Sequence, residues 1–114
     1  MRKFGLIGFP LTHSFSESYF QEKIFKEGFS GCQYQNYPIH DIKKITLLLE
    51  KENLSGFNIT IPHKENIIPF LDELSAEANT IGAVNTVVKR DEKWIGHNTD
   101  WTGFYESIKP LLKK

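Results

Sequence analysis

Polar side chains suited to binding a small anion and moving a proton follow three predicted strands of this chain. Lys64 and Asp100 form a pair in which the carboxylate could orient the ammonium group while burial lowers the lysine pKa, an arrangement suited to proton transfer. Hydroxyl and amide groups complete the set, from Ser14, Ser16, Asn58, Thr60, Asn85, Asn98 and Thr99. This mixture favours a small polyhydroxylated anion over a fatty or aromatic ligand.

Each of these residues also has a purely structural interpretation. Ser14 precedes Glu17 by three residues, the spacing of a capping box at a helix start. Asn98 and Asp100 suit turns or helix caps, and Lys64 could be a surface lysine. The argument for binding is that the residues are expected at one end of a predicted sheet.

The elements that would position these residues alternate between strands and helices. Short apolar or alternating runs predict strands at residues 3–9, 33–39, 54–61, 83–89 and 93–96. Caps and apolar stripes predict helices at residues 14–28, 42–51, 62–67, 72–79 and 100–112. Asp41 should cap the second helix, and Pro69 should end the third. Pro38 favours an edge position for the second strand or the end of that strand.

This order of elements predicts an α/β fold. Parallel neighbours need crossover connections, so the chain should form a three-layer sandwich with a mainly parallel mixed sheet flanked by helices. The last two strands, joined by the polar turn at residues 90–92, should add an antiparallel hairpin. Ligands of such sheets bind beyond the carboxyl ends of the strands, which directs attention to the loops after Phe9, Ile61 and Gly96.

Composition narrows the class of protein. The 114 residues predict one domain, and 14 Lys and Arg balance 14 Asp and Glu, which disfavours nucleic acid and anionic membranes as partners. The single cysteine, Cys32, cannot form an intrachain disulfide, so we expect a reducing, cytoplasmic location. The apolar run at the N-terminus ends at Pro10, too short for a signal peptide or a membrane span, which predicts a soluble, unprocessed chain.

The four histidines do not predict a metal site. None has a histidine partner three or four residues away, so a helical metal pair is excluded. His13, His63 and His97 flank the predicted site, where we expect them to be neutral and hydrogen-bonded. Cys32 is expected to pack rather than to react.

Four runs of residues, taken in order, resemble the successive motifs of the shikimate dehydrogenase family. They read GFPLTHSFS at residues 8–16, NITIPHK at 58–64, IGAVNT at 81–86 and GHNTDWTG at 96–103. The resemblance covers essentially the whole chain and corresponds to the N-terminal, substrate-binding domain of the family. It implies part of an NADP-dependent oxidoreductase that reversibly reduces 3-dehydroshikimate to shikimate in aromatic amino acid (chorismate) biosynthesis.

The resemblance also implies roles for individual residues. Lys64 would be the general acid and base at the reacting oxygen, with Asp100 bonded to the neighbouring hydroxyl and coupled to the lysine. Ser14 and Ser16 would hold the substrate carboxylate, helped by Thr60. In the same way, the resemblance implies that Asn85 binds a ring hydroxyl. It makes Asn58 a weaker substrate-binding candidate, with a role in shaping the strand end as the alternative.

A cofactor site is missing from this pattern. Family members continue into a dinucleotide-binding domain, and nothing in this chain matches its G-x-G-x-x-G turn. We therefore expect a partner domain, removed from this chain or present on another, to bind NADP, and we expect this chain alone to be inactive. A quinate/shikimate dehydrogenase, a non-catalytic small-acid-binding module, NAD in place of NADP, and a homodimer stay open as alternatives.

Overall fold

The computed structural model describes residues 2–11, 22, 26 and 31–99. Its strands are β1 (Arg2–Gly8), β2 (Cys32–Pro38), β3 (Leu54–Ile59), β4 (Glu73–Leu74), β5 (Thr86–Arg90) and β6 (Lys93–His97). Its helices are η1 (Ile42–Lys44), α2 (Ile45–Glu52), η2 (Ile68–Phe70) and α3 (Ala76–Ile81), where η marks a 3-10 helix. The helices predicted at residues 14–28 and 100–112 lie outside the described residues, apart from residues 22 and 26. None of the described helices is long and apolar enough to cross a membrane.

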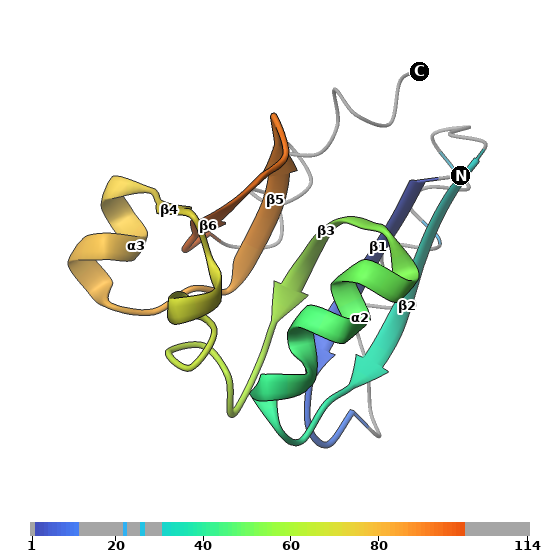
Figure 1. Cartoon of the computed structure of the whole chain (residues 1–114), viewed down its shortest axis with the longest axis horizontal. Coiled ribbons are helices and arrows are strands. Elements are labelled where there is room, and N and C mark those ends of the chain that lie inside the picture. The colour runs from blue at the N-terminus through green and yellow to red at the C-terminus, as the bar shows by residue number, and fades with distance from the viewer. Residues whose placement is uncertain (1, 12–21, 23–25, 27–30, 100–114) are drawn as a thin grey trace.

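The strands form one mixed sheet in the order β2-β1-β3-β5-β6-β4 (Figure 1). β1 pairs in parallel with β2 and β3, whereas β5 runs antiparallel to both β3 and β6. The predicted α/β fold with a mixed sheet and a final hairpin is confirmed. So is the edge position of β2, where Pro38 lacks the N–H that a central strand would need.

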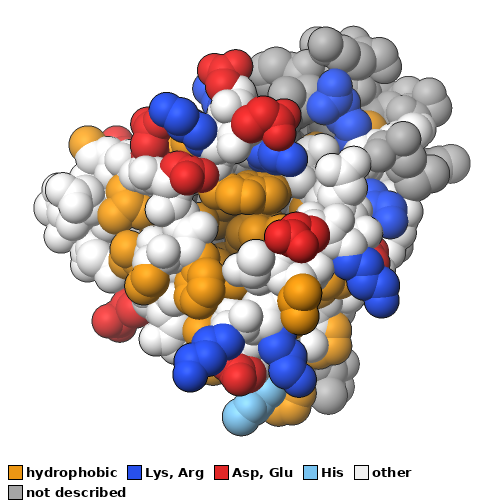
Figure 2. All heavy atoms as spheres, in the orientation of Figure 1, with side chains coloured by type: hydrophobic (Ala, Val, Ile, Leu, Met, Phe, Trp, Pro, Cys, Tyr) orange, Lys and Arg blue, Asp and Glu red, His pale blue; other side chains and the backbone are white. Residues whose placement is uncertain are grey.

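One face of the sheet is covered by α2 and carries the main apolar core (Figure 1). Asp41 begins this helical stretch as predicted, because its side chain accepts a hydrogen bond from the Lys43 amide at 3.0 Å. Ile45 of α2 is fully buried with Ile7, Phe57 and Val87, which come from three neighbouring strands. On this face hydrophobic side chains show in a central hollow, ringed by charged residues (Figure 2).

The opposite face of the same strands is also buried, but it carries polar side chains. Because side chains alternate along a strand, Tyr34, Asn58 and Thr86 point away from the α2 side. They are 0%, 2% and 1% exposed. Asn58 and Thr86 occupy paired positions of β3 and β5. Both faces of the sheet are therefore buried, but only the face opposite α2 carries Asn58 and Thr86 among its buried side chains.

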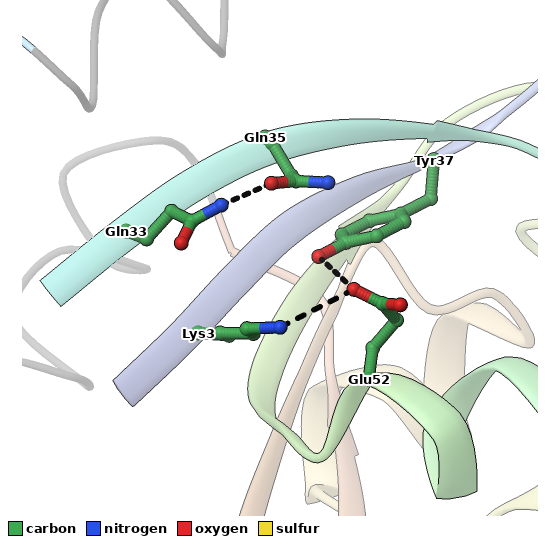
Figure 3. A network of polar contacts seen from close by, with 5 residues as sticks. All are labelled: Lys3, Gln33, Gln35, Tyr37 and Glu52. Atoms are coloured by element: carbon green, nitrogen blue, oxygen red, sulfur yellow. Dashed lines mark hydrogen bonds and ion pairs between the residues drawn. The ribbon is translucent and has the colours of Figure 1, made fainter. Parts of the chain in front are cut away.

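A small polar network fastens α2 to the edge of the sheet (Figure 3). Glu52 at the end of α2 accepts a hydrogen bond from the Tyr37 hydroxyl at 3.3 Å and pairs with the Lys3 ammonium at 3.5 Å. Burial, and then the Glu52 carboxylate, raise the pKa of Tyr37 to about 12. A Cβ on Gly5 would lie 2.5 Å from the Tyr37 ring, so only glycine lets the ring cross β1.

The helix predicted at residues 62–67 is wrong. These residues form turns, and the nearby helix is η2, which contains Pro69 instead of ending before it. The Lys64 carbonyl accepts the Val84 amide at 2.8 Å, and the Glu65 carbonyl accepts the Ile68 amide at 3.2 Å, because Pro69 has no N–H to offer it. The hydrogen bonds of an α-helix therefore do not continue through these residues.

The helix predicted at residues 72–79 begins later, at Ala76, and ends at Ile81. Ser75 is its N-cap, accepting the Ala78 amide at 3.1 Å, and Gly82 ends it with a φ of 78°. The residues before Ser75 form β4, which pairs with β6 and was not predicted. Asp72 is tied to that strand because its carboxylate accepts the Trp94 amide at 2.7 Å.

Candidate functional site

The carboxyl ends of three strands lie together at one end of the sheet, as expected for the site. We call this strand-end boundary the edge. β1, β3 and β6 point the same way, and the antiparallel β5 begins where they end. The Thr60 amide donates to the Ile7 carbonyl at 2.9 Å, and the Ile59 amide donates to the Asn85 carbonyl at 2.8 Å. Thr60 and Asn85 are therefore brought to the same edge from segments 25 positions apart in sequence.

Lys64 lies on a turn whose backbone is held on two sides. Its carbonyl is bonded to the Val84 amide, one residue before Asn85. The preceding residue, His63, is 2% exposed, and its Nε2 lies 2.6 Å from the Ile39 carbonyl. A carbonyl only accepts, so His63 Nε2 is the donor, in the hydrogen-bonding role expected for this histidine. The Lys64 side chain is exposed, and no carboxylate among the described residues pairs with it. Its ammonium can therefore meet a ligand.

Close packing joins the loops that follow β1 and β3. A Cβ on Gly8 would lie 2.3 Å from the Thr60 methyl carbon and 2.9 Å from the Ile61 carbonyl oxygen. The Phe9 amide donates to that same carbonyl at 3.1 Å. The loop that continues to Ser14 and Ser16 thus starts beside Thr60, while the two serines themselves lie outside the described residues.

Asn85 clamps the segment that follows β6. Its Oδ1 accepts the Thr99 amide at 2.9 Å, and its Nδ2 donates to the Thr99 carbonyl. Asn98 reinforces the contact, since its Nδ2 donates to the Ala83 carbonyl at 3.1 Å. Thr99 is the last described residue of this segment, and Asp100 lies outside the described part of the chain.

Asn58 lies beneath this edge and is enclosed by protein. Its Oδ1 accepts the Tyr34 hydroxyl at 2.7 Å, and its Nδ2 donates to Thr86 Oγ1 at 3.3 Å. With both ends of its amide bonded inside the sheet, Asn58 is placed to support the strand end and not to face a ligand.

Two titratable groups near the sheet have shifted pKa values. Burial, with a contribution from the Arg90 charge, lowers the pKa of His97, which stands opposite Thr86 in the hairpin. The imidazole is therefore neutral at neutral pH. Burial raises the pKa of the Cys32 thiol, which makes it a poor nucleophile. Among residues 2–11, 22, 26 and 31–99, no three side chains of the metal-ligating types lie together.

Several residues that shape this edge were not predicted to belong to it. Thr86 stands in the polar motif at residues 81–86, next to Asn85, so its hydroxyl was a usable signal. Tyr34 had no such signal, because it lies on a strand that is 24 positions from Asn58 and reaches it only through the sheet. Gly8 lies within the strand predicted at residues 3–9, and its close contact with Thr60 had no signal in that prediction.

Comparison with known proteins gives a consistent family. Residues 6–87 match the family described as shikimate dehydrogenase substrate binding domain. The shikimate dehydrogenase (NADP(+)) of Staphylococcus epidermidis is 39% identical over 115 aligned positions. That alignment covers 97% of this chain and 42% of the relative, so the chain spans less than half of the relative's length.

Solved structures of shikimate dehydrogenases share the fold. The enzyme from Aquifex aeolicus has a TM-score of 0.81 at 39% identity, covering 97% of this chain and 42% of that one. The enzyme from Listeria monocytogenes, solved in complex with shikimate and NAD, has a TM-score of 0.81 at 36% identity, with 97% and 39% covered. The likeness extends over almost the entire chain and a minor part of each relative.

Proposed function

Because this chain belongs to the shikimate dehydrogenase family, as its substrate-binding domain, we propose that it binds shikimate and 3-dehydroshikimate at the edge formed by Thr60, Lys64 and Asn85. One observation carries the proposal. The Lys64 carbonyl accepts the Val84 amide, so the backbone of an exposed lysine lies one residue from the clamped Asn85, at the carboxyl ends of the parallel strands. This is where an α/β sheet binds its ligand.

The proposed chemistry assigns the proton to Lys64. Its ammonium group would deliver a proton to the keto oxygen as the ketone is reduced and take it back in the reverse reaction. Asp100 would accept a hydrogen bond from the neighbouring hydroxyl, while Ser14 and Ser16, with Thr60, would hold the carboxylate. Asn85 would bind a ring hydroxyl through its amide.

The described residues contain no glycine-rich turn of the kind that binds a dinucleotide. β1 ends at Gly8 and continues into Phe9 and Pro10 in place of a glycine-rich turn, and Gly8 is packed closely against Thr60. We propose that NADP, the source of the hydride, binds to the part of the relatives' length that this chain does not cover. The chain alone is then inactive as a dehydrogenase.

Titration of the 114-residue chain with shikimate, followed by 15N NMR, tests the proposed function. Saturable shifts should centre on the amides of Thr60, Lys64, Asn85 and Thr99. Replacing Lys64 by Met should weaken shikimate binding. Ser55→Ala, at the opposite end of β3, should leave the affinity within about twofold of the unchanged chain. Absence of binding, or shifts centred elsewhere, would contradict the proposal.

A parallel titration with quinate separates the nearest alternative. Quinate bears one more ring hydroxyl than shikimate, so a preference for it would identify a quinate/shikimate dehydrogenase relative. A chain that binds either acid, yet gives no reduction of 3-dehydroshikimate when it is joined to the remainder of a relative, would instead be a non-catalytic small-acid-binding module.

A further inference from the structure

A row of buried polar side chains crosses the sheet and ends on Asn85. The Tyr34 hydroxyl contacts Asn58 Oδ1 at 2.7 Å, Asn58 Nδ2 contacts Thr86 Oγ1 at 3.3 Å, and Thr86 Oγ1 contacts Asn85 Oδ1 at 3.0 Å. The first three residues are at most 2% exposed and come from three different strands, β2, β3 and β5. The row joins the far edge of the sheet to the proposed site.

The direction of every hydrogen bond in this row is determined by groups that can act in only one way. The Thr99 amide only donates, so the Asn85 atom that it contacts at 2.9 Å is Oδ1. The Asn85 carbonyl only accepts, so the Asn58 atom 3.5 Å from it is Nδ2, and Asn58 Oδ1 therefore faces Tyr34.

The remaining protons follow from these two assignments. Asn58 Oδ1 cannot donate, so the Tyr34 hydroxyl does. Asn85 Oδ1 cannot donate either, so the single hydrogen of Thr86 Oγ1 goes to it. Thr86 Oγ1 then accepts from Asn58 and from the Thr99 hydroxyl 3.3 Å away. Donation runs one way, from Tyr34 through Asn58 and Thr86 to Asn85.

This polarity dictates what Asn85 can offer a ligand. Its Oδ1 already accepts two hydrogen bonds, from Thr86 and from the Thr99 amide. Its Nδ2 gives one hydrogen to the Thr99 carbonyl, and no described residue accepts the other. Asn85 thus meets the ligand as a donor only, held both by the row beneath it and by Thr99.

We propose that Tyr34 and Thr86 are positioning residues that act through this donor row to orient the Asn85 amide toward a ring hydroxyl of the substrate. The proposal rests on the proposed function, which supplies the ligand. A merely structural row would stabilise the sheet without affecting how one particular hydroxyl is bound.

The chain offers a matched pair of tyrosines for the test. Tyr34→Phe removes the first donor of the row and keeps the buried ring. Tyr37→Phe removes a hydroxyl from the same strand, but that hydroxyl bonds to Glu52 on the α2 side (Figure 3). Thr86→Val and Thr86→Ser form a second pair of similar shape, of which only the serine variant keeps the hydroxyl.

Binding of shikimate to these variants should separate the two members of each pair. Tyr34→Phe should weaken binding roughly three- to tenfold, which is the fold-change that corresponds to the loss of one neutral hydrogen bond. Thr86→Val should weaken it about tenfold, because Thr86 makes more than one hydrogen bond. Tyr37→Phe and Thr86→Ser should stay within about twofold of the unchanged chain. Equal losses for both tyrosine variants would overturn the proposal.

Analogues of shikimate that each lack one ring hydroxyl distinguish positioning from general destabilisation. With the analogue that lacks the hydroxyl bound by Asn85, Tyr34→Phe should not weaken binding further, whereas its penalty should persist with the two analogues that lack another hydroxyl. A penalty that is the same for shikimate and for every analogue would show that the row is only structural.

A measurement without substrate tests the row independently. The scalar coupling from the Thr99 amide nitrogen to the Asn85 side-chain carbonyl carbon reports their hydrogen bond and should weaken in Tyr34→Phe and Thr86→Val, but not in Tyr37→Phe. An unchanged coupling in the first two would overturn the proposal. If the unchanged chain bound no shikimate, the proposed function would fail, and this coupling alone would decide whether the row orients Asn85.

Discussion

The face of the sheet covered by α2 and the edge that carries Lys64 differ in how far their side chains are enclosed by protein. On the covered face Ile7, Ile45 and Phe57 are fully buried in one hydrophobic cluster. At the edge the Lys64 side chain is exposed, and no described residue binds its ammonium group. Side chains already surrounded by protein contribute to stability, whereas an unpaired group leaves its interactions for a ligand. The two regions should therefore respond to mutation in opposite ways.

The donor row lies between these extremes. Asn58 and Thr86 are as buried as the apolar core, yet their hydrogen bonds lead to Asn85 at the edge. Losing the partner of a buried polar group lowers the stability of the fold. The hydrogen bonds of such a group also hold its bonded neighbours in one orientation. Only in this row do we expect stability and ligand binding to fall together.

The largest expected effect is on catalysis at the edge. In this chain joined to the remaining part of the Staphylococcus epidermidis shikimate dehydrogenase, Lys64→Ala should lower kcat by about 10² to 10⁴ with a modest change in KM. The free energy of unfolding should change by less than about 0.5 kcal/mol, because the side chain is exposed. Steady-state kinetics and urea unfolding measure the two quantities.

Lys43→Ala is the matched control, since Lys43 is also an exposed lysine but lies in η1. It should change neither quantity. A kcat for Lys64→Ala within about twofold of the unchanged enzyme, equivalent to roughly 0.4 kcal/mol of barrier, would remove the catalytic assignment.

The reverse pattern is expected for the covered face. Phe57 is 0% exposed, and its ring centroid lies 5.5 Å from that of Trp94. Phe57→Ala should lower the free energy of unfolding by about 3 to 5 kcal/mol, because it leaves a cavity that the neighbours fill only in part. Urea unfolding measures this loss.

Shikimate affinity of the folded Phe57 variant should stay within about twofold, which NMR titration of the folded population can establish. Phe57→Leu should show the same separation with a smaller loss of stability. A large loss of affinity with little loss of stability would break the distinction between the two regions.

The smallest expected effect is a pH dependence of stability at His97. Burial lowers its pKa in the folded chain below the ordinary value of 6.5, so the unfolded chain binds the proton more readily. Its contribution to stability is full above pH 6.5 and is lost as the pH falls through the lower folded value.

Urea unfolding at a series of pH values checks this direction. The free energy of unfolding should fall on acidification below pH 6.5, and it should fall less steeply in His97→Gln. An equal slope in the variant would assign the acid sensitivity to other groups.

Local patterns predicted most of the strands. Alternation and apolar runs located β1, β2, β3, β5 and β6 to within a few residues, and Pro38 placed β2 at an edge. The prediction failed where a long-range hydrogen bond replaced a local one. Residues 62–67 look helical by themselves, but the Val84 amide takes the Lys64 carbonyl. β4 has two residues and depends on pairing with β6, so no local pattern in the sequence predicts it.

For the candidate site, the sequence alone determined which chemical groups are available and roughly where they stand. The motifs at residues 58–64, 81–86 and 96–103 supply the lysine, the asparagines and the threonines, and their positions after strands follow from hydrophobic patterns of short range. Such patterns reflect neighbours within a few residues, and they could mark Asn85 as a candidate ligand.

Only the tertiary structure decided how those groups act. The register in which β1, β2, β3 and β5 pair makes Asn85 a hydrogen-bond donor and brings Tyr34 into the row that supports it. The same register packs Thr60 against Gly8. A shift of one residue in any pairing would turn the alternate side chains to the other face. Hydrogen-bond direction depends on which atoms meet, and residues 24 to 28 positions apart meet only once the sheet has formed.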